Sequence, residues 1–390
     1  MKRNIDWVSI CIDMLIGYIR GEFVTKEMKA RFSLVAESCL EVISHVSVSI
    51  DNLVFYYAYL IDGFYRIDMP DEAIKLFKST KLLLENSDTS DLTSEMRFMF
   101  YHNACRVLNQ QGELLVARKL LNEIAKYYKR YKDFERRDYK TLYETYLLLS
   151  ENYRKDYDVH YTVSFHYLKL ADSLVSKLEK DEAMNFITVA LGRAMLYNEL
   201  EKDSHVYELL KYISEIICEI EVSDRNIIAF CSNLSDIAFL YGELGMYEKS
   251  LDCNFALLNY EKDLFDEDKN LDISTTLHNI GYSFMGLGNN TRALDFYYKS
   301  LQYREMLMDS ITANTYDLIA ETYEAMGETT KTLDFLFKAL AIYLEDENTG
   351  NIPFEVTYEW IGQCYYKLGK LVEAAKYYNL SQQYMSDDVE

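Results

Sequence analysis

The apolar positions of this chain recur at helical spacing, and in its second half the helices that they predict come in pairs. The clearest pair occupies residues 275–306. Its first helix carries apolar or small residues at i, i+3, i+4 and i+7, namely Leu277, Ile280, Gly281 and Phe284. Its second helix places small residues beside large ones, at Ala293, Tyr297, Ser300 and Leu301. Gly288 predicts a left-handed cap at the end of the first helix, and Gly281 predicts a close approach of the second.

The same pair of helices recurs along the chain with a period of about 40 residues. In the second half the period is marked by turn glycines spaced 43, 39 and 42 residues apart, at Gly245, Gly288, Gly327 and Gly369. An aromatic residue precedes each of these glycines by four positions, and a small residue follows about five positions later. Weaker units occupy residues 56–83 and 101–124, and two further units without a turn glycine occupy about 139–180 and 185–220. A fixed period of this length indicates stacked helical hairpins.

The unit at 275–306 resembles a tetratricopeptide repeat (TPR), whose pattern is large–Leu–Gly–Tyr, then a turn glycine, then Ala–aromatic–Ala. The resemblance covers about residues 51–385 and is strongest over 226–385. The long period is similar to that of kinesin light chains and of bacterial peptide-receptor regulators of the Rap type. The resemblance implies an all-α fold, a right-handed TPR superhelix (α-solenoid) of about eight helical hairpins in residues 51–390. We expect an N-terminal helical pair or cap in residues 1–50.

Composition agrees with long helices in a reducing compartment. The 390 residues include only 2 prolines and 14 glycines, and 35 tyrosines and 19 phenylalanines are available to fill wide gaps between helices. The seven cysteines are scattered and contain no C-x-x-C pair, which indicates a reduced, cytoplasmic chain. The N-terminal apolar stretch is interrupted by Asp13, and we expect no membrane-spanning segment.

The charge of the chain limits its partners. A net charge of −22 repels nucleic acid phosphates and anionic membrane surfaces, so we expect neither as a partner. Residues 126–140 run against this trend, since basic residues and tyrosines alternate there as in some nucleic-acid patches. In so acidic a chain we interpret this stretch as a helix extension, with docking of an acidic protein as the alternative.

No catalytic signature occurs in the sequence. The motifs of zinc peptidases (HExxH), serine hydrolases (GxSxG) and P-loop nucleotidases are absent, and the six histidines never pair at metal-ligand spacing. We therefore expect no enzymatic activity, no metal and no cofactor.

The resemblance implies that the first helix of each hairpin lines a concave groove, and that residues flanking the Leu–Gly positions contact a bound segment. Two units carry His-Asn there, at His102-Asn103 and His278-Asn279. The family uses Asn to hold a peptide backbone, because an amide both donates and accepts hydrogen bonds. The other candidate groove residues on this face are Arg106, Asn109, Gln110, Asp236, Phe239, Tyr282, Asn314, Asp317, Glu321, Glu324, Glu359 and Gln363. The acids among them favour a Lys- or Arg-bearing peptide, and an ordinary solvated helix face is the alternative.

These observations predict a non-enzymatic scaffold that binds a protein or peptide segment in its groove. A first alternative is a peptide-responsive bacterial regulator of the Rap type, favoured by the chain length, the leading helical pair and the sequence Gly17-Tyr-Ile-Arg20. A second alternative is the sensory half of a larger signalling protein such as a cyclase, kinase or protease. The sequence does not indicate the ligand or the oligomeric state.

Overall fold

The computed structural model of this protein describes residues 36, 50–66, 70–86, 94–130, 136–156, 160–178, 182–223, 226–264, 271–304, 310–345 and 354–387. The N-terminal helical pair predicted in residues 1–50 lies outside the described residues, apart from single positions. Residues 131–135, in the middle of the basic stretch, lie outside them as well. Helices are the only regular elements in the part of the chain that is described.

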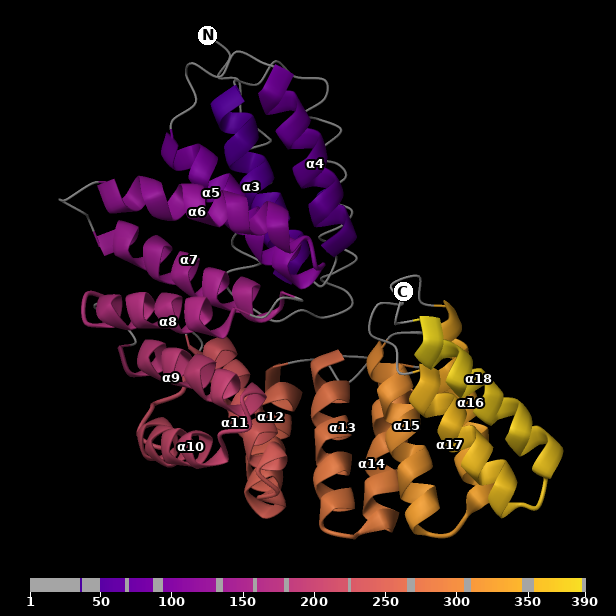
Figure 1. Cartoon of the computed structure of the whole chain (residues 1–390). Helices are drawn as coiled ribbons and strands as arrows, with labels where there is room; N and C mark the ends of the chain where they lie inside the picture. Colours follow the sequence, from indigo (N-terminus) through magenta and orange to yellow (C-terminus); the bar gives the residue numbers. More distant parts are fainter. Residues whose placement is uncertain are drawn as a thin grey trace. The chain divides into compact units, whose positions relative to one another are not determined.

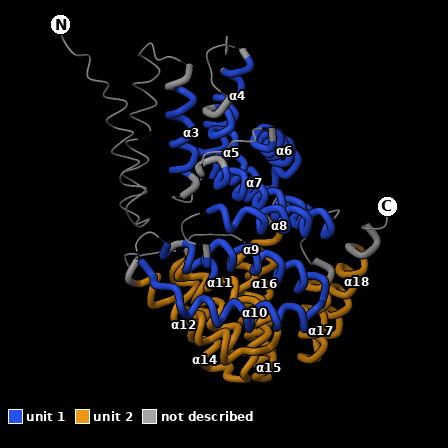
Figure 2. Tube along the Cα trace, turned by 90° about the vertical axis from the view of Figure 1, so that its left-hand side faces the viewer, with its two compact units in different colours: residues 1–233 blue, residues 234–390 orange. Residues whose placement is uncertain are grey.

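The chain forms two compact units, unit 1 (residues 1–233) and unit 2 (residues 234–390), coloured separately in Figure 2. The helices that lie in unit 1 are α3 (Ile50–Arg66), α4 (Pro70–Asn86), α5 (Ser94–Gln110), α6 (Leu114–Arg130), α7 (Arg136–Arg154), α8 (Tyr161–Val175), α9 (Glu182–Glu199) and α10 (Asp203–Ile217). Helix α11 (Ile227–Glu243) crosses the boundary. The helices of unit 2 are α12 (Tyr247–Leu264), α13 (Leu271–Gly286), α14 (Asn290–Tyr303), α15 (Ser310–Ala325), α16 (Thr329–Glu345), α17 (Phe354–Lys367) and α18 (Leu371–Asp387).

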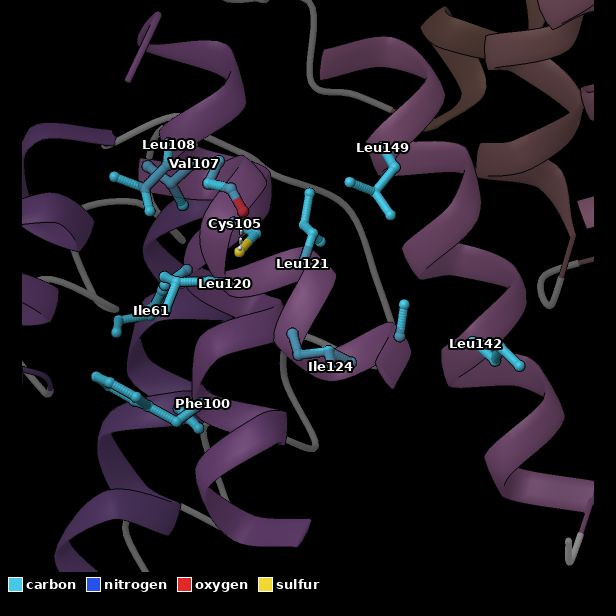
Figure 3. Close-up of a cluster of buried hydrophobic side chains, with 14 of the residues drawn as sticks. Ile61, Phe100, Cys105, Val107, Leu108, Leu120, Leu121, Ile124, Leu142 and Leu149 are labelled. Carbon is cyan, nitrogen blue, oxygen red and sulfur yellow. Dashed lines mark hydrogen bonds between the residues drawn. The ribbon is translucent and has the colours of Figure 1, made fainter. Parts of the chain in front are cut away.

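In each unit, helices that follow one another in sequence pack against one another (Figure 1). First helices of successive hairpins also touch: α3 packs on α5, α5 on α7 and α13 on α15. Figure 3 shows how this buries a continuous core in unit 1, with Phe100 of α5, Leu121 of α6 and Leu149 of α7 almost fully inaccessible. Each hairpin therefore shares its core with its neighbours, which is how a repeat array is stabilised.

The left-handed cap predicted at Gly288 is confirmed, and the other turn glycines adopt the same conformation. Gly112, Gly245, Gly288, Gly327 and Gly369 have φ between 69° and 76°. Around Gly288, the glycine N–H donates to the Met285 carbonyl at 2.8 Å, and the next N–H, of Asn289, donates to the Phe284 carbonyl at 2.9 Å. The same two bonds recur at Gly245, Gly327 and Gly369. They satisfy carbonyls that the end of a helix leaves without partners.

The hairpin of α9 and α10 uses the same cap without a glycine. Glu201 occupies the turn with φ 53°, and it is the one described residue other than glycine with a positive φ. Its N–H donates to the Asn198 carbonyl, and the N–H of Lys202 donates to the Tyr197 carbonyl, both at 2.9 Å. Tyr197 thus holds the place of the aromatic residue four positions before the turn. This unit follows the repeat frame, although its sequence lacks the glycine that marks it elsewhere.

Gly281 confirms the predicted close approach of the second helix. A Cβ at this position would lie 2.6 Å from two ring carbons of Tyr297, and Tyr297 is fully buried. Gly362 holds the corresponding place in the last hairpin, where a Cβ would lie 3.1 Å from the ring of Tyr378. The small residue on the first helix is therefore what lets the tyrosine of the second helix fill the gap.

Candidate functional site

In unit 1, the predicted residue Arg106 joins the first helices of three successive hairpins. Its guanidinium on α5 donates to Asp62 of α3 at 3.3 Å and to Glu144 of α7 at 2.8 Å. All three side chains are partly buried, with 17–27% exposed. Lys140 of α7 also lies 3.9 Å from Glu144 Oε1. The ion pairs of Arg106 join α3, α5 and α7.

The first His-Asn pair is also engaged within the fold. His102 is buried, with its Nε2 3.9 Å from Glu144 Oε2 and without a hydrogen-bond partner in the described part of the chain. Burial and then the charge of Arg106 lower the pKa of His102 to about 4, so the ring is neutral near pH 7. The Asn103 amide donates to the Ala58 carbonyl at 3.0 Å. Asn103 therefore lies at the contact of α5 with α3, and His102 faces Glu144 of α7.

Asn109 belongs to a buried polar network between α5, α6 and α7. Its amide donates to the Leu148 carbonyl at 3.0 Å, and its carbonyl oxygen accepts from Asn152 at 2.7 Å. Asn152 in turn accepts from Arg118 Nε at 2.7 Å. Sequence reasoning missed Asn152 and Arg118, although Asn152 stands 43 residues after Asn109 and so at the repeat period. Gln110, one position further, is exposed.

In unit 2, the second His-Asn pair divides into a packed and an open residue. His278 is buried on α13, and its Nδ1 lies 2.9 Å from Thr315 Oγ1 of α15. Burial and then Arg304 lower the pKa of His278 to about 4. Asn279 is half-buried, and no described residue forms a hydrogen bond with its side-chain amide.

Two of the predicted aromatic residues of unit 2 lie on the first helices α11 and α13. Phe239 of α11 is 44% exposed, and Asp236 on the same helix is half-buried. Tyr282 of α13 is half-buried and packs edge-on against Tyr247, with ring centroids 6.1 Å apart. A Cβ at Gly242 would lie 3.5 Å from the Tyr282 ring.

The predicted acids of α15 differ in their surroundings. Asp317 is half-buried: Oδ2 accepts a 2.5 Å hydrogen bond from Tyr343, while the buried Oδ1 lacks a partner among the described residues. Burial raises the pKa of Asp317 to about 6, against the effect of the Tyr343 bond. Glu324 accepts from Trp360 Nε1 at 2.7 Å and is paired with Lys367 of α17. Its charge is therefore compensated within the protein.

The remaining predicted residues of unit 2 face solvent. The side chain of Glu321 is exposed. The pKa of Glu321 is raised, mainly by the desolvation of its carboxyl group and to a lesser extent by the negative charge of Glu324. Asn314 on α15 is exposed, as are Glu359 and Gln363 on α17, which form a 3.2 Å hydrogen bond with each other. We call Phe239, Asn279, Tyr282, Asn314, Glu321, Glu359 and Gln363 the first-helix surface of unit 2, since all lie on the first helices of its hairpins.

The described residues hold no group of three or more His, Cys, Asp or Glu side chains that could bind a metal ion. Among them, no helix is long and apolar enough to cross a membrane. The arrangement on unit 2 offers amide, carboxylate and aromatic groups. Such a surface can bind a partner through hydrogen bonds, charge and ring contacts.

Comparison with known proteins agrees with this architecture. Residues 272–345, which span α13 to α16, match the tetratricopeptide repeat family. The quorum sensor NprR from B. thuringiensis in its apo form is similar in structure, with 16% identity, 97% of this chain and 99% of that chain covered, and a TM-score of 0.59. NprR in complex with its cognate peptide NprX has 16% identity, coverage of 98% and 100%, and a TM-score of 0.51. The apo form of RapI has 14% identity, coverage of 97% of both chains and a TM-score of 0.54.

No curated protein sequence matches the chain. At these low sequence identities, the structural likeness shows the fold alone. The likeness to NprR and to RapI covers 97% of this chain. The predicted all-α fold of TPR-type hairpins and the resemblance to Rap-type regulators are therefore confirmed.

Proposed function

We propose that this chain is a non-enzymatic binding protein that recognises a peptide or protein segment through the first-helix surface of unit 2. The observation that carries the proposal is the contrast between the units. In unit 1, Asn103, Arg106 and Asn109 bond to neighbouring helices. In unit 2, Phe239 and Glu321 are exposed on first helices. The complex of the similar protein NprR with a peptide supports this choice of ligand class.

The chemistry of the surface indicates what such a segment contains. The side-chain amide of Asn279 can pair with both groups of a peptide bond. Phe239 and Tyr282 offer rings against which an apolar side chain can pack. Glu321 and Glu359 carry charge that Lys or Arg would complement. A segment with one apolar and one basic side chain fits these groups best.

A peptide-responsive regulator of the Rap type is a narrower form of the same proposal. It is favoured by likeness to RapI and NprR over 97% of the chain. In this proposal the protein acts in the cytoplasm, in keeping with the reduced thiols of Cys105, Cys218 and Cys364. Neither nucleic acid nor a membrane is a proposed partner, given the charge of −22.

The test begins with the selection of a ligand from random sequences. Random dodecapeptides displayed on phage are selected on the wild-type protein. They are counter-selected on a variant with Phe239→Ala, Glu321→Gln and Glu359→Gln. Enrichment of peptides with Lys or Arg beside an apolar residue is expected. A selection that enriches the same peptides on both proteins would place the binding elsewhere.

Calorimetry with one enriched peptide then measures single contributions. Asn279→Ala should weaken binding by about 1–3 kcal/mol, since it leaves a peptide group of the ligand without a partner. Glu321→Gln should lower the association rate and reduce its dependence on salt. Glu248→Gln and Asp334→Asn, exposed acids of the second helices α12 and α16, serve as matched controls and should leave the affinity unchanged.

A further inference from the structure

One buried carboxyl group lies where two successive hairpins of unit 2 meet. Glu261 is near the end of α12, and α12 packs directly on α13, the first helix of the next hairpin. The side chain is 5% exposed. Its Oε1 accepts a 3.0 Å hydrogen bond from Thr276 Oγ1 of α13. This carboxyl group therefore lies within the contact between the two hairpins.

The second oxygen of Glu261, Oε2, is buried, and no described residue donates a hydrogen bond to it. A buried carboxylate with an unpaired oxygen is unfavourable, whereas the protonated acid carries no charge. Burial raises the pKa of Glu261 to about 7, and the negative charge of Asp272 on α13 acts in the same direction. The Thr276 bond opposes both.

Two cations of the described residues lie near this junction, and neither bonds Glu261. Lys262, the next residue of α12, is exposed. Arg304, which follows α14, is buried, but its guanidinium bonds Ser274 and Thr275 at 2.8 and 3.1 Å. Arg304 therefore bonds Ser274 and Thr275, whereas Glu261 bonds Thr276, and no ion pair joins these two side chains among the described residues.

Helix α11 contacts α12 through a hydrogen bond from Ser250 to the Ala238 carbonyl, and both of its charged residues are acids. Asp236 and Glu243 stand nine and two positions before the turn at Gly245, whereas Glu261 stands sixteen positions after it. In an antiparallel hairpin they therefore lie nearer to the turn than Glu261 does. They add no positive charge.

We propose that the junction of α12 and α13 is a pH-responsive hinge, in which Glu261 is protonated while the hairpins are packed and loses its proton when they separate. The packed state binds the proton more tightly than an open state with the ordinary pKa of 4.5. The stabilisation from the protonated group is complete below that value and is lost as the pH rises through about 7.

The two pKa values set the size of the effect. Their difference allows at most about a 300-fold change in the opening constant between the acidic and basic limits. Between pH 6.0 and pH 8.5 the expected increase is about tenfold. Asp317, with a pKa of about 6, contributes about twofold over the same interval and acts on α15. This inference does not depend on the identity of any ligand.

Hydrogen exchange followed by mass spectrometry tests the hinge in the full-length protein. Exchange at pH 6.0 and 8.5 is divided by the intrinsic rate at each pH, so that it reports opening. We expect opening constants in segments 255–264 and 272–280 to rise about tenfold in the wild type. Asp317→Asn should retain this rise, and Glu248→Gln, an exposed acid on the same helix as Glu261, should retain it too.

Glu261→Gln replaces the acid with an uncharged group of the same shape, and its profile should be flat. A rise that persists in Glu261→Gln would overturn the proposal. So would equal opening of the wild type at the two pH values, a result that needs no variant to fold. A rise of the same size in every helix of unit 2 would also contradict it, because the effect would then be global.

Discussion

Gly281 provides the sharpest test of how the hairpins of unit 2 pack. The proposed change is Gly281→Ala, which adds a single carbon. That carbon would lie 2.6 Å from two ring carbons of Tyr297, about 1 Å closer than ordinary carbon contacts allow. Tyr297 has no free space to move into, since it is fully buried and packs against the ring of His278 at 5.8 Å between centroids.

Two effects of this substitution oppose each other. Alanine favours a helix over glycine by roughly 0.5–1 kcal/mol. Overpacking a filled core costs roughly 1–3 kcal/mol. Because Tyr297 is enclosed, we expect the second effect to dominate, with a net loss of about 1–2 kcal/mol in the free energy of unfolding. Replacement by Leu should cost more, since its branched side chain has no space at all.

Urea denaturation followed by circular dichroism measures this loss. Gly362→Ala is the matched control, because Gly362 holds the same place in the last hairpin but its tyrosine neighbour, Tyr378, is 3.1 Å away and only partly buried. We expect that variant to be neutral or slightly stabilised. In a protein that already carries Tyr297→Leu, the further change Gly281→Ala should cost less free energy of unfolding than it costs in the wild type. Equal effects of the two glycine substitutions would refute the reasoning.

Three further substitutions have expected outcomes. Glu201→Gly should raise the melting temperature in calorimetry, because relief of the left-handed conformation, worth about 1–2 kcal/mol, exceeds the entropic cost of glycine. Arg106→Ala should lower the free energy of unfolding in urea by about 1–3 kcal/mol, since Asp62 and Glu144 both lose the guanidinium that links α3 to α7 through α5; no loss would show that these ion pairs are negligible. In urea titrations, Asp317→Asn should stabilise the protein by about 1–3 kcal/mol at pH 7.5 and should not stabilise it near pH 4. The reason is that the folded pKa of Asp317 is raised to about 6, so the stability that comes from the protonated acid is lost as the pH rises through that value. Equal effects at the two pH values would contradict this sign.

The fold was predictable where one residue type is tied to one backbone conformation. Turn glycines predict left-handed caps, and Gly288 has φ 73°. The limit of this signal is visible at Glu201, which adopts φ 53° with the same capping bonds. Backbone hydrogen bonds hold a cap that any residue can enter at a cost in strain. A sequence without the glycine therefore hides the turn.

The candidate site was predictable only as a face. Periodicity places Arg106 and Asn109 on the same side of a first helix as the ligand-reading positions of the family. It does not show which residue of the next hairpin stands opposite. Glu144 and Asn152, 38 and 43 residues later, engage these side chains in the folded protein. Exposure in unit 2 depends in the same way on partners that are distant in sequence.

The central claim is that a ligand binds on the first helices of unit 2. Photo-crosslinking tests it most directly: a selected peptide carrying one benzophenone is irradiated with the protein, and the attachment sites are read by mass spectrometry. We expect attachment in α11, α13, α15 or α17, close to Phe239, Tyr282, Glu321 or Glu359. Attachment confined to unit 1, or to the second helices α12, α14, α16 and α18, would contradict it.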